Sequence, residues 1–454
     1  MGTENFGIVG LYISIQAFFG LMDFGLPITA NRQVSILRAN TGSHIEVARL
    51  IRAFEIIILI IALFGLLIMA VISPWLSANW LNPVSLSIGE ITIALIMAGA
   101  SAALRFPCAF YNNILFAFDR HFAPNFVTAM AAYLRVLIAV IFLIQFGPSL
   151  ESFFLSQLIV NGVELIALQY LAWRKTVGVF FVSPDWQQFK KTIRLTLSLS
   201  LVSLTAFALS QIDKVILVKL LPLDQFGAYS VAFALAMGLL PLSYSIGNAV
   251  FPEFSRLKAK AITHELSEKL SKALRLTLLL VVPAAAFLIT QNNGYEGLLG
   301  LFTNEAKTIS LLLPVLAMGS LFQAFVVLPH AYRIAAGEVR YILWINSALI
   351  TPYMIAVYFG TLHGGIIGAC WAFMGLNFLN FIFHYYYLRA NPLWVKNYVV
   401  LLLSMLTAII IGFILANLSI FADNLWTRLG IALINILVIL AGMYYFLLYG
   451  TKRT

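Results

Sequence analysis

Charged residues are scarce in this sequence. Of its 454 residues, only 10% are Asp, Glu, Lys or Arg, whereas 61% are hydrophobic. A water-soluble domain of this length has no core large enough to bury so much apolar surface. The composition therefore excludes a soluble enzyme or binding domain and predicts an all-α polytopic membrane protein.

Cysteine and histidine are also scarce. The two cysteines, Cys108 and Cys370, lie far apart within apolar stretches, and the six histidines show no metal-ligand spacing. These absences give no support to a disulfide framework or a metal site, so we expect neither a metal nor a cofactor. The N-terminus lacks a basic segment followed by an apolar stretch and a small-residue cleavage site, so no cleavable signal peptide is predicted.

Thirteen apolar stretches are long enough to cross the hydrocarbon core of a bilayer. The net charge of +10 does not indicate a nucleic-acid binder, because Lys and Arg are spread over the short loops between these stretches. The predicted spans are 7–30, 53–73, 88–117, 125–147, 152–173, 195–221, 226–250, 274–291, 307–329, 341–360, 364–388, 398–419 and 426–449.

Lysine and arginine are absent from every second loop. Because these residues concentrate on the cytoplasmic side, the alternation predicts a cytoplasmic C-terminus and, with an odd number of spans, an N-terminus outside. The loops without Lys or Arg are 74–87, 148–151, 222–225, 292–306, 361–363 and 420–425.

Two short motifs recur at an offset of 220 residues. Phe6-Gly7 is repeated by Phe226-Gly227, and Ser35-x-Leu37-Arg38 is repeated by Ser255-x-Leu257-Lys258. The second copy follows a predicted span, 195–221, whereas no span precedes Phe6. We therefore expect a first helix to be missing, and a chain that genuinely begins outside is the alternative.

The repeat predicts two six-helix lobes, related by a pseudo-two-fold axis along the membrane normal and followed by two extra helices. This arrangement is typical of transporters with a central site between lobes. The predicted boundaries are 1–191 for the N-terminal lobe without its first helix, 192–390 for the C-terminal lobe and 391–454 for the extra transmembrane helices. Glycine and proline occur in both equivalent spans, where they permit close packing or bends, and their presence in both copies favours bends. They are Gly20, Gly25, Pro27, Gly238, Pro241 and Gly247.

Polar residues recur at helical spacing inside several predicted spans. In span 88–117 the intervals are 4, 3 and 4 residues, which places Ser101, Arg105, Cys108 and Asn112 on one face. The same reasoning groups Asn125, Thr128 and Arg135 in the next span, Gln157, Asn161 and Glu164 in the one after it, and Tyr12, Gln16 and Asp23 in the first.

The charged residues inside the spans are the candidate site. Four cations, Arg105, Arg135, Lys214 and Lys219, face three carboxylates, Asp23, Glu164 and Asp213. A wet cavity lined by these groups suits an anionic headgroup, for which the planar guanidinium is the better anchor. The alternative is that they neutralise one another as ion pairs between helices. Three carboxylates cannot pair with every cation one to one, so at least one cation should be available. Lys219 is expected to extend to the interface.

The segments GTENFGIVGL, MDFGLPITANRQVS, QIDKVILVKLLPLDQFGAYSVA and FPEFSRL resemble the polysaccharide flippases of the Wzx type. These share a superfamily with the multidrug and toxin extrusion (MATE) transporters and the lipid II flippases, and the resemblance covers essentially the whole chain from Gly2. It implies translocation of an undecaprenyl-pyrophosphate-linked oligosaccharide, such as an O-antigen repeat unit, from the cytoplasmic to the outer face of a bacterial inner membrane by alternating access.

Carried onto this sequence, the resemblance makes Arg105, Arg135 and Lys214 the candidate substrate-binding cations. Asp23, Glu164 and Asp213 are then candidates for coupling to a cation or proton gradient, or charge partners of the cations. The implied partners are the lipid-linked oligosaccharide, membrane lipids, a coupling ion and the polysaccharide polymerase and chain-length proteins, with no nucleic acid.

Three other functions compete with this interpretation. A drug efflux pump of the same superfamily should prefer carboxylates to cations in its cavity. A membrane-embedded glycan polymerase or ligase needs catalytic groups in an outward loop, and the longest one, 292–306, offers Glu296 and Glu305 but no Arg or His. A structural scaffold leaves the charges within the spans unexplained.

Overall fold

The first predicted span, 7–30, is two helices. In a computed structural model of the chain, α1 (Thr3–Leu21) and α2 (Leu26–Thr41) are separated by a break. Phe24 and Gly25 in this break have φ values of 47° and 74°, which an α-helix cannot continue. The Asp23 carboxylate accepts a hydrogen bond from the Gly25 amide at 2.7 Å and stabilises the turn. A bend predicted from Gly25 and Pro27 is therefore present.

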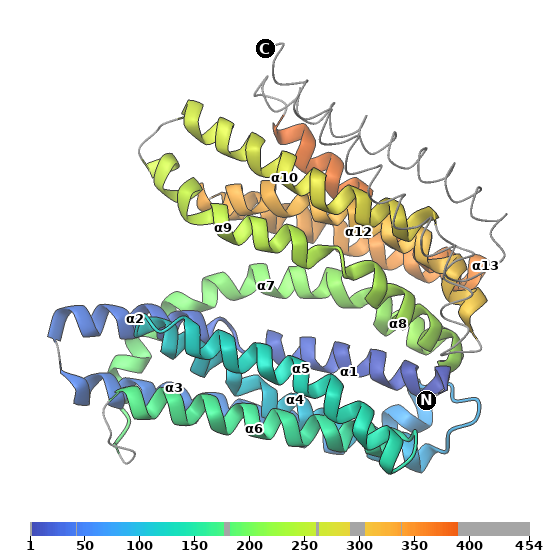
Figure 1. The fold of residues 1–454 in the computed structure, drawn as a ribbon, viewed down its shortest axis with the longest axis horizontal. Helices are drawn as coiled ribbons and strands as arrows, with labels where there is room; N and C mark the ends of the chain where they lie inside the picture. Colours follow the sequence, from blue (N-terminus) through green and yellow to red (C-terminus); the bar gives the residue numbers. More distant parts are fainter. Residues whose placement is uncertain are drawn as a thin grey trace. The chain divides into compact units, whose positions relative to one another are not determined.

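The structure describes residues 2–41, 43–176, 182–259, 263–290, 305–336 and 338–388. Within these ranges the regular elements are all helical, which confirms the predicted all-α class (Figure 1). After α1 and α2 they are α3 (His44–Trp75), the short π-helix η1 (Leu76–Trp80), α4 (Ile88–Ala117), α5 (Phe122–Gln145), α6 (Leu150–Thr176), α7 (Trp186–Leu220), α8 (Leu223–Met237), α9 (Leu240–Ala259), α10 (Thr263–Thr290), α12 (Ala306–Ala335) and α13 (Val339–Leu388).

Nine helical segments of the described residues are long and apolar enough to cross a membrane. They make the chain a multi-pass membrane protein. The predicted span 226–250 is interrupted between α8 and α9, and α13 consists of two helices that meet at Gly365, where φ is 57°. The predicted spans 398–419 and 426–449 lie outside the described residues, so the total of thirteen stays a prediction.

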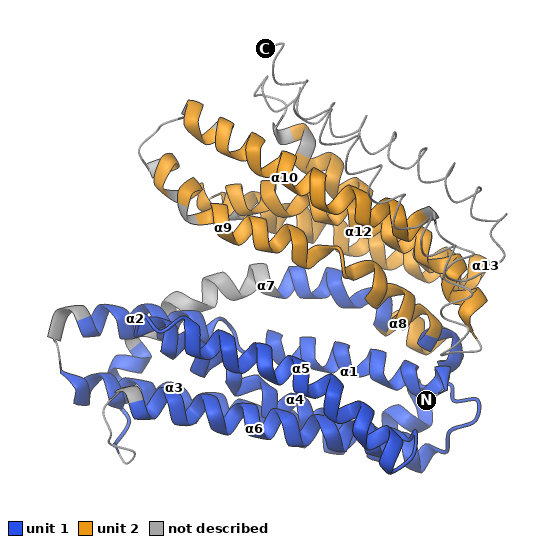
Figure 2. Ribbon diagram, in the orientation of Figure 1, with its two compact units in different colours: residues 1–214, 222–227 blue, residues 215–221, 228–454 orange. Residues whose placement is uncertain are grey.

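The chain divides into two compact units (Figure 2). Unit 1 consists of residues 1–214 and 222–227, and unit 2 of residues 215–221 and 228–454. The division falls within α7 and α8, whereas the predicted lobe boundary lies between residues 191 and 192, close to the start of α7.

Helix α4 is the centre of unit 1, where it packs against α1, α2, α3 and α6. It begins with a capping box, in which the Ser87 hydroxyl accepts from the Glu90 amide and the Glu90 carboxylate accepts from the Ser87 amide. Small buried residues let its neighbours approach, and a Cβ atom on Gly99 would lie 2.7 Å from Cβ of Met69 in α3. The central position of α4 brings its polar residues into reach of several helices.

Helix α12 has the corresponding place in unit 2, where it packs against α9, α10 and α13. Its buried side chains include Leu321 and Phe325, which belong to one apolar cluster with Leu278 and Val282 of α10. Like α4, it is 30 residues long.

The N-terminal end of α1 is fixed by Glu4. The Glu4 carboxylate accepts hydrogen bonds from the backbone amides of Val84 and Ser85 at 2.7 and 2.9 Å, and also from the Ser85 hydroxyl. These bonds hold the segment between η1 and α4 against the start of α1.

The repeated Phe-Gly motifs meet within unit 1. A Cβ atom on Gly7 of α1 would lie 2.5 Å from the carbonyl oxygen of Leu223, and one on Gly227 of α8 would lie 3.0 Å from the Gly7 nitrogen and closer still to the Thr3 carbonyl oxygen. Only glycine allows backbones so close together. Residues 7 and 227, like residues 3 and 223, are 220 positions apart. The contact is thus reciprocal, as between two-fold-related segments, whereas the duplication into two lobes stays a prediction.

Candidate functional site

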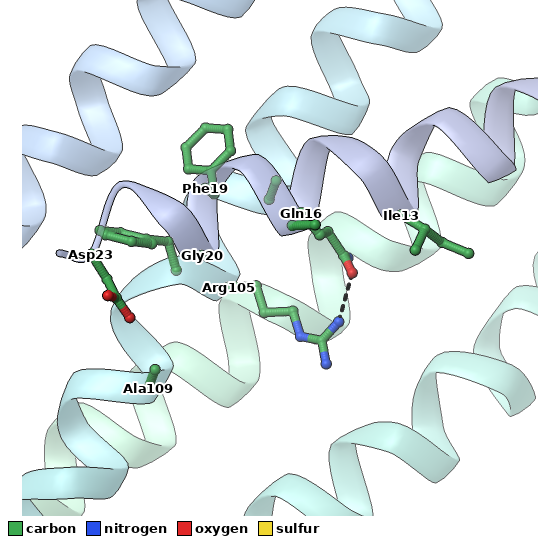
Figure 3. Close-up of a pocket in the computed structure, with 10 residues that line it drawn as sticks. Ile13, Gln16, Phe19, Gly20, Asp23, Arg105 and Ala109 are labelled. Atoms are coloured by element: carbon green, nitrogen blue, oxygen red, sulfur yellow. Dashed lines mark hydrogen bonds between the residues drawn. The ribbon is translucent and has the colours of Figure 1, made fainter. Parts of the chain in front are cut away.

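Helices α1 and α4 of unit 1 line a pocket of about 330 Å³ (Figure 3). The pocket combines a guanidinium, a carboxylate and a side-chain amide with apolar walls, so it offers both charge and shape to a ligand. Its lining residues are Ile13, Gln16, Ala17, Phe19, Gly20 and Asp23 on α1 or directly after it, and Ala102, Arg105, Phe106 and Ala109 on α4.

Arg105 is the exposed cation of this pocket. Its Nη1 donates a hydrogen bond to Oε1 of Gln16 at 2.8 Å, which ties α4 to α1 and orients the guanidinium. Among the residues that the structure describes, no carboxylate lies within 4.0 Å of Arg105. A guanidinium carries five N–H donors. Arg105 is therefore placed to donate further hydrogen bonds to an anion in the pocket.

Asp23 lines the same pocket and is half-buried. One carboxylate oxygen accepts from the Gly25 amide, so the turn between α1 and α2 fixes the side chain. Gln16, Gly20 and Asp23 follow at intervals of 4 and 3 residues, which puts them along one face of α1 and its end. The predicted face with Tyr12, Gln16 and Asp23 thus provides both polar groups on the α1 side of the pocket.

Arg135 lies in a buried polar network instead of this pocket. Its Nε donates to Oδ1 of Asn161 at 2.8 Å, and its Nη2 forms an ion pair with Glu164. The side chains of Arg135 and Glu164 are only 12% and 2% exposed. The polar faces predicted on α5 and α6 therefore meet, and this pair has the geometry of a structural ion pair between helices.

Asn161 extends the network to two further helices. Its Nδ2 donates to Oγ of Ser101 at 2.8 Å and to Oη of Tyr12 at 3.3 Å, and these two hydroxyls lie 2.7 Å apart. Tyr12 belongs to α1, Ser101 to α4 and Asn161 to α6, and all are buried. The network crosslinks the helices that carry the pocket.

Lys214 and Asp213 form an ion pair with each other. The Lys214 ammonium lies 3.2 Å from Oδ1 of Asp213 and donates to the Ser210 carbonyl at 2.8 Å. Both residues are buried. The structure therefore separates the predicted site residues into three groups: Arg105 with Asp23 at the pocket, Arg135 with Glu164, and Lys214 with Asp213.

Sequence reasoning missed Glu55, which is 1% exposed in α3. Its Oε1 accepts hydrogen bonds from Oη of Tyr111 at 2.6 Å, Nε1 of Trp173 at 2.9 Å and Nε2 of Gln169 at 3.2 Å. Arg52 pairs with the same carboxylate and stacks over the Trp173 ring at 4.3 Å. The sequence does contain a signal for this residue, because Glu55 is a carboxylate inside the predicted span 53–73.

Arg333 lies just beyond the predicted span 307–329, where a basic loop is expected, but it is wholly buried in α12. Its guanidinium carbon lies 3.8 Å from the centroid of the Tyr341 ring. Arg333 is not in a loop because α12 continues past the predicted span to Ala335. In the described part of the chain, no group of three His, Cys, Asp or Glu residues is placed to hold a metal ion.

Comparisons with known proteins give one family and one type of fold. Residues 1–258 match the family described as "Polysaccharide biosynthesis protein". A protein from Shigella flexneri named "Putative O-antigen transporter" is 22% identical over 374 residues, which cover 81% of this chain and 86% of that protein. The family resemblance expected from the motifs is thereby confirmed.

Solved structures of transporters share the fold. The lipid II flippase MurJ in an inward closed conformation has a TM-score of 0.70 and 15% identity, with 98% of both chains covered. An inward-facing multidrug resistance MATE family transporter also has a TM-score of 0.70 and 15% identity, covering 86% of this chain and 91% of that one. A transporter of the same superfamily from Pyrococcus furiosus has a TM-score of 0.54 and 16% identity, over 85% and 88%. These similarities establish a transporter fold.

Proposed function

Because residues 1–258 match its model, the chain belongs to the polysaccharide biosynthesis protein family, and we propose that it is a lipid-linked oligosaccharide flippase. Its substrate is an undecaprenyl-pyrophosphate-linked oligosaccharide, such as an O-antigen repeat unit. The protein moves this substrate from the cytoplasmic to the periplasmic face of a bacterial inner membrane by alternating access, without catalysing a covalent step.

Arg105 is the observation that carries this proposal. It is exposed at the pocket, oriented by Gln16, and has no carboxylate within 4.0 Å among the described residues. Moving an unpaired charge into an apolar medium costs on the order of tens of kcal/mol by Born estimates. A pyrophosphate can cross the membrane when a guanidinium replaces its hydration by paired hydrogen bonds. The other two candidate cations already have carboxylate partners, Glu164 and Asp213.

The position of the pocket along α1 agrees with cytoplasmic loading. The 19 residues of α1 rise by about 28 Å, close to the thickness of the hydrocarbon core. In the predicted orientation α1 runs inward, so Gln16 and Asp23 belong to its cytoplasmic half. A lipid-linked sugar assembled in the cytoplasm then meets Arg105 before it has crossed the membrane.

Coupling to a proton or cation gradient is part of the proposal, with Asp23, Glu164 and Asp213 as candidates. Binding of a proton or cation at Glu164 must compete with its ion pair to Arg135. Collapse of the proton gradient by a protonophore, in vesicles that accumulate the labelled lipid-linked oligosaccharide, should slow transport. An unchanged rate with both proton and sodium gradients collapsed would remove coupling from the proposal.

Complementation tests the function. In cells that lack their own flippase, the chain should restore surface polysaccharide, and Arg105→Gln should abolish that export while leaving the amount of protein in the membrane unchanged. Arg120→Gln is the matched control, because Arg120 is an exposed arginine just after α4 and outside the pocket. Full export by the Arg105→Gln variant, or no export by the unaltered chain in hosts with several repeat-unit structures, would refute the proposal.

Asp23 gives specific support to one competing function. A carboxylate in the pocket is the group that a drug efflux pump needs for an organic cation. Such a pump would protect efflux-deficient cells against cationic dyes and lose this protection on Asp23→Asn. Protection of that kind, without restored surface polysaccharide, would favour efflux over flipping.

A further inference from the structure

We propose that Asp23 is a specificity-determining residue that binds the hydroxyl groups of the sugar attached to the pyrophosphate. This inference rests on the proposed function, in which Arg105 binds the pyrophosphate itself. The pocket then binds two parts of the substrate, the charged pyrophosphate at one end of the pocket and the first sugar at the other.

The two ends of the pocket are separated along α1. Gln16 holds the Arg105 guanidinium at one end, and Asp23 follows seven positions later on the same face. The part of this interval within α1, from Gln16 to Leu21, rises by about 8 Å, and Asp23 lies beyond it in the turn. Figure 3 shows the Arg105 guanidinium beside Gln16 and the Asp23 carboxylate at the other end of the pocket. A ligand that spans both groups needs an anionic part and a hydrogen-bonding part roughly one sugar away from it.

The chemistry of Asp23 selects hydroxyl donors for the second part. An ionised carboxylate only accepts hydrogen bonds. It repels a second phosphate and accepts from sugar hydroxyls, which are donors. The turn to Gly25 occupies one oxygen and fixes the side chain, while the side chain is half-buried in the wall of the pocket. Asp23 is therefore pre-oriented for a ligand, which lowers the entropy cost of binding.

The walls of the pocket fit one sugar ring rather than a whole repeat unit. Phe19 and Phe106 supply an apolar wall, and the remaining lining is small at Ala17, Gly20 and Ala109. The volume of about 330 Å³ is at the lower end of known ligand pockets, which begin at about 300 Å³. Later sugars of the repeat unit must lie outside it, so Asp23 discriminates at the first sugar only.

Binding of two probes to the purified full chain in lipid nanodiscs tests the inference. The probes are undecaprenyl diphosphate and undecaprenyl diphosphate that carries one hexose. Asp23→Asn keeps an oxygen for the Gly25 amide but removes the charge. It should weaken binding of the glycosylated lipid by about tenfold, the scale of a hydrogen bond to a charged group, and should not weaken binding of the bare lipid. Arg105→Gln should weaken binding of both probes by similar factors.

Asp185→Asn is the matched control. Asp185 is half-buried, lies outside the pocket, and also accepts a backbone amide, from Gln188 at 3.0 Å. Equal losses for both probes on Asp23→Asn, or no loss for either, would overturn the role of Asp23 while leaving the flippase proposal intact. Unchanged binding of both probes by the Arg105→Gln variant would instead remove the pyrophosphate site on which the inference rests.

Discussion

The glycine crossing between α1 and α8 gives the most direct structural prediction. Gly227→Ala puts a Cβ atom 2.9 Å from the carbonyl carbon of Thr3 and 3.0 Å from the nitrogen of Gly7. The three nearest atoms belong to the backbone, so no side-chain rotation relieves the clash, and the two helices must separate. Gly7→Ala is milder, because part of its clash is with the Leu223 side chain, at 2.9 Å from Cδ1.

The expected magnitude follows from two opposing effects. Overpacking lowers the free energy of unfolding by about 1–3 kcal/mol, and separation of the helices lowers it further. Alanine in place of glycine within a helix raises it by about 0.5–1 kcal/mol. We expect Gly227→Ala to lower the free energy of unfolding by about 1–2 kcal/mol. In a unit of this size that corresponds to roughly 2–4 °C in Tm per kcal/mol.

Thermal stability in detergent, followed by size-exclusion chromatography after heating, measures the effect. Gly162→Ala is the control, since no atom lies within 4 Å of a Cβ at Gly162 in α6. The expected order of Tm is Gly162→Ala highest, then Gly7→Ala, then Gly227→Ala. If Gly227→Ala were as stable as the control, the close contact of the two Phe-Gly motifs would be refuted.

The buried polar groups yield three further predictions. Glu55→Ala removes the common acceptor of Tyr111 and Trp173 and the ion pair with Arg52. The free energy of unfolding of the purified protein should therefore fall by about 3–5 kcal/mol. A change in Tm of less than about 1 °C would contradict this. Glu164→Gln should destabilise the protein more than the double variant that also carries Arg135→Met, because the single change leaves a buried unpaired cation; additive losses in Tm would show that the pair is not coupled. Ser101→Ala should lower the free energy of unfolding by about 1–3 kcal/mol, because Tyr12 and Asn161 lose a hydroxyl partner. A Tm measurement would register this loss. The control Ser87→Gly, which only weakens a helix cap, should lower Tm by less.

Hydrophobic length predicted most helices well but not their ends or breaks. The span 88–117 coincides with α4, because a capping box begins it and a polar turn ends it. In contrast, the span 7–30 hides a break at Phe24, whose positive φ is fixed by Asp23 and Gly25. Glycine and proline indicate a bend there, whereas hydropathy alone predicts one continuous span.

Periodicity predicted which residues share a face, but not which residues meet. It grouped Asn161 with Glu164, and both do face polar residues of other helices. It could not assign Arg135 to Glu164 and leave Arg105 at a pocket, because that choice depends on how four helices pack in three dimensions. Glu55 shows the same limit, since its donors Tyr111, Gln169 and Trp173 lie 56 to 118 positions away in the sequence.

The reciprocal contact of Gly7 and Gly227 also sets an order of events during synthesis. Thr3 and Gly7 are synthesised about 220 residues before their neighbours in α8. At about 5–20 residues per second, α1 waits roughly 10–45 s for that partner. During this time Glu4 can already bind the amides of Val84 and Ser85. Helix α1 is thus among the last helices of its unit to be locked, because a nascent chain that ends before Gly227 lacks the α8 side of this contact.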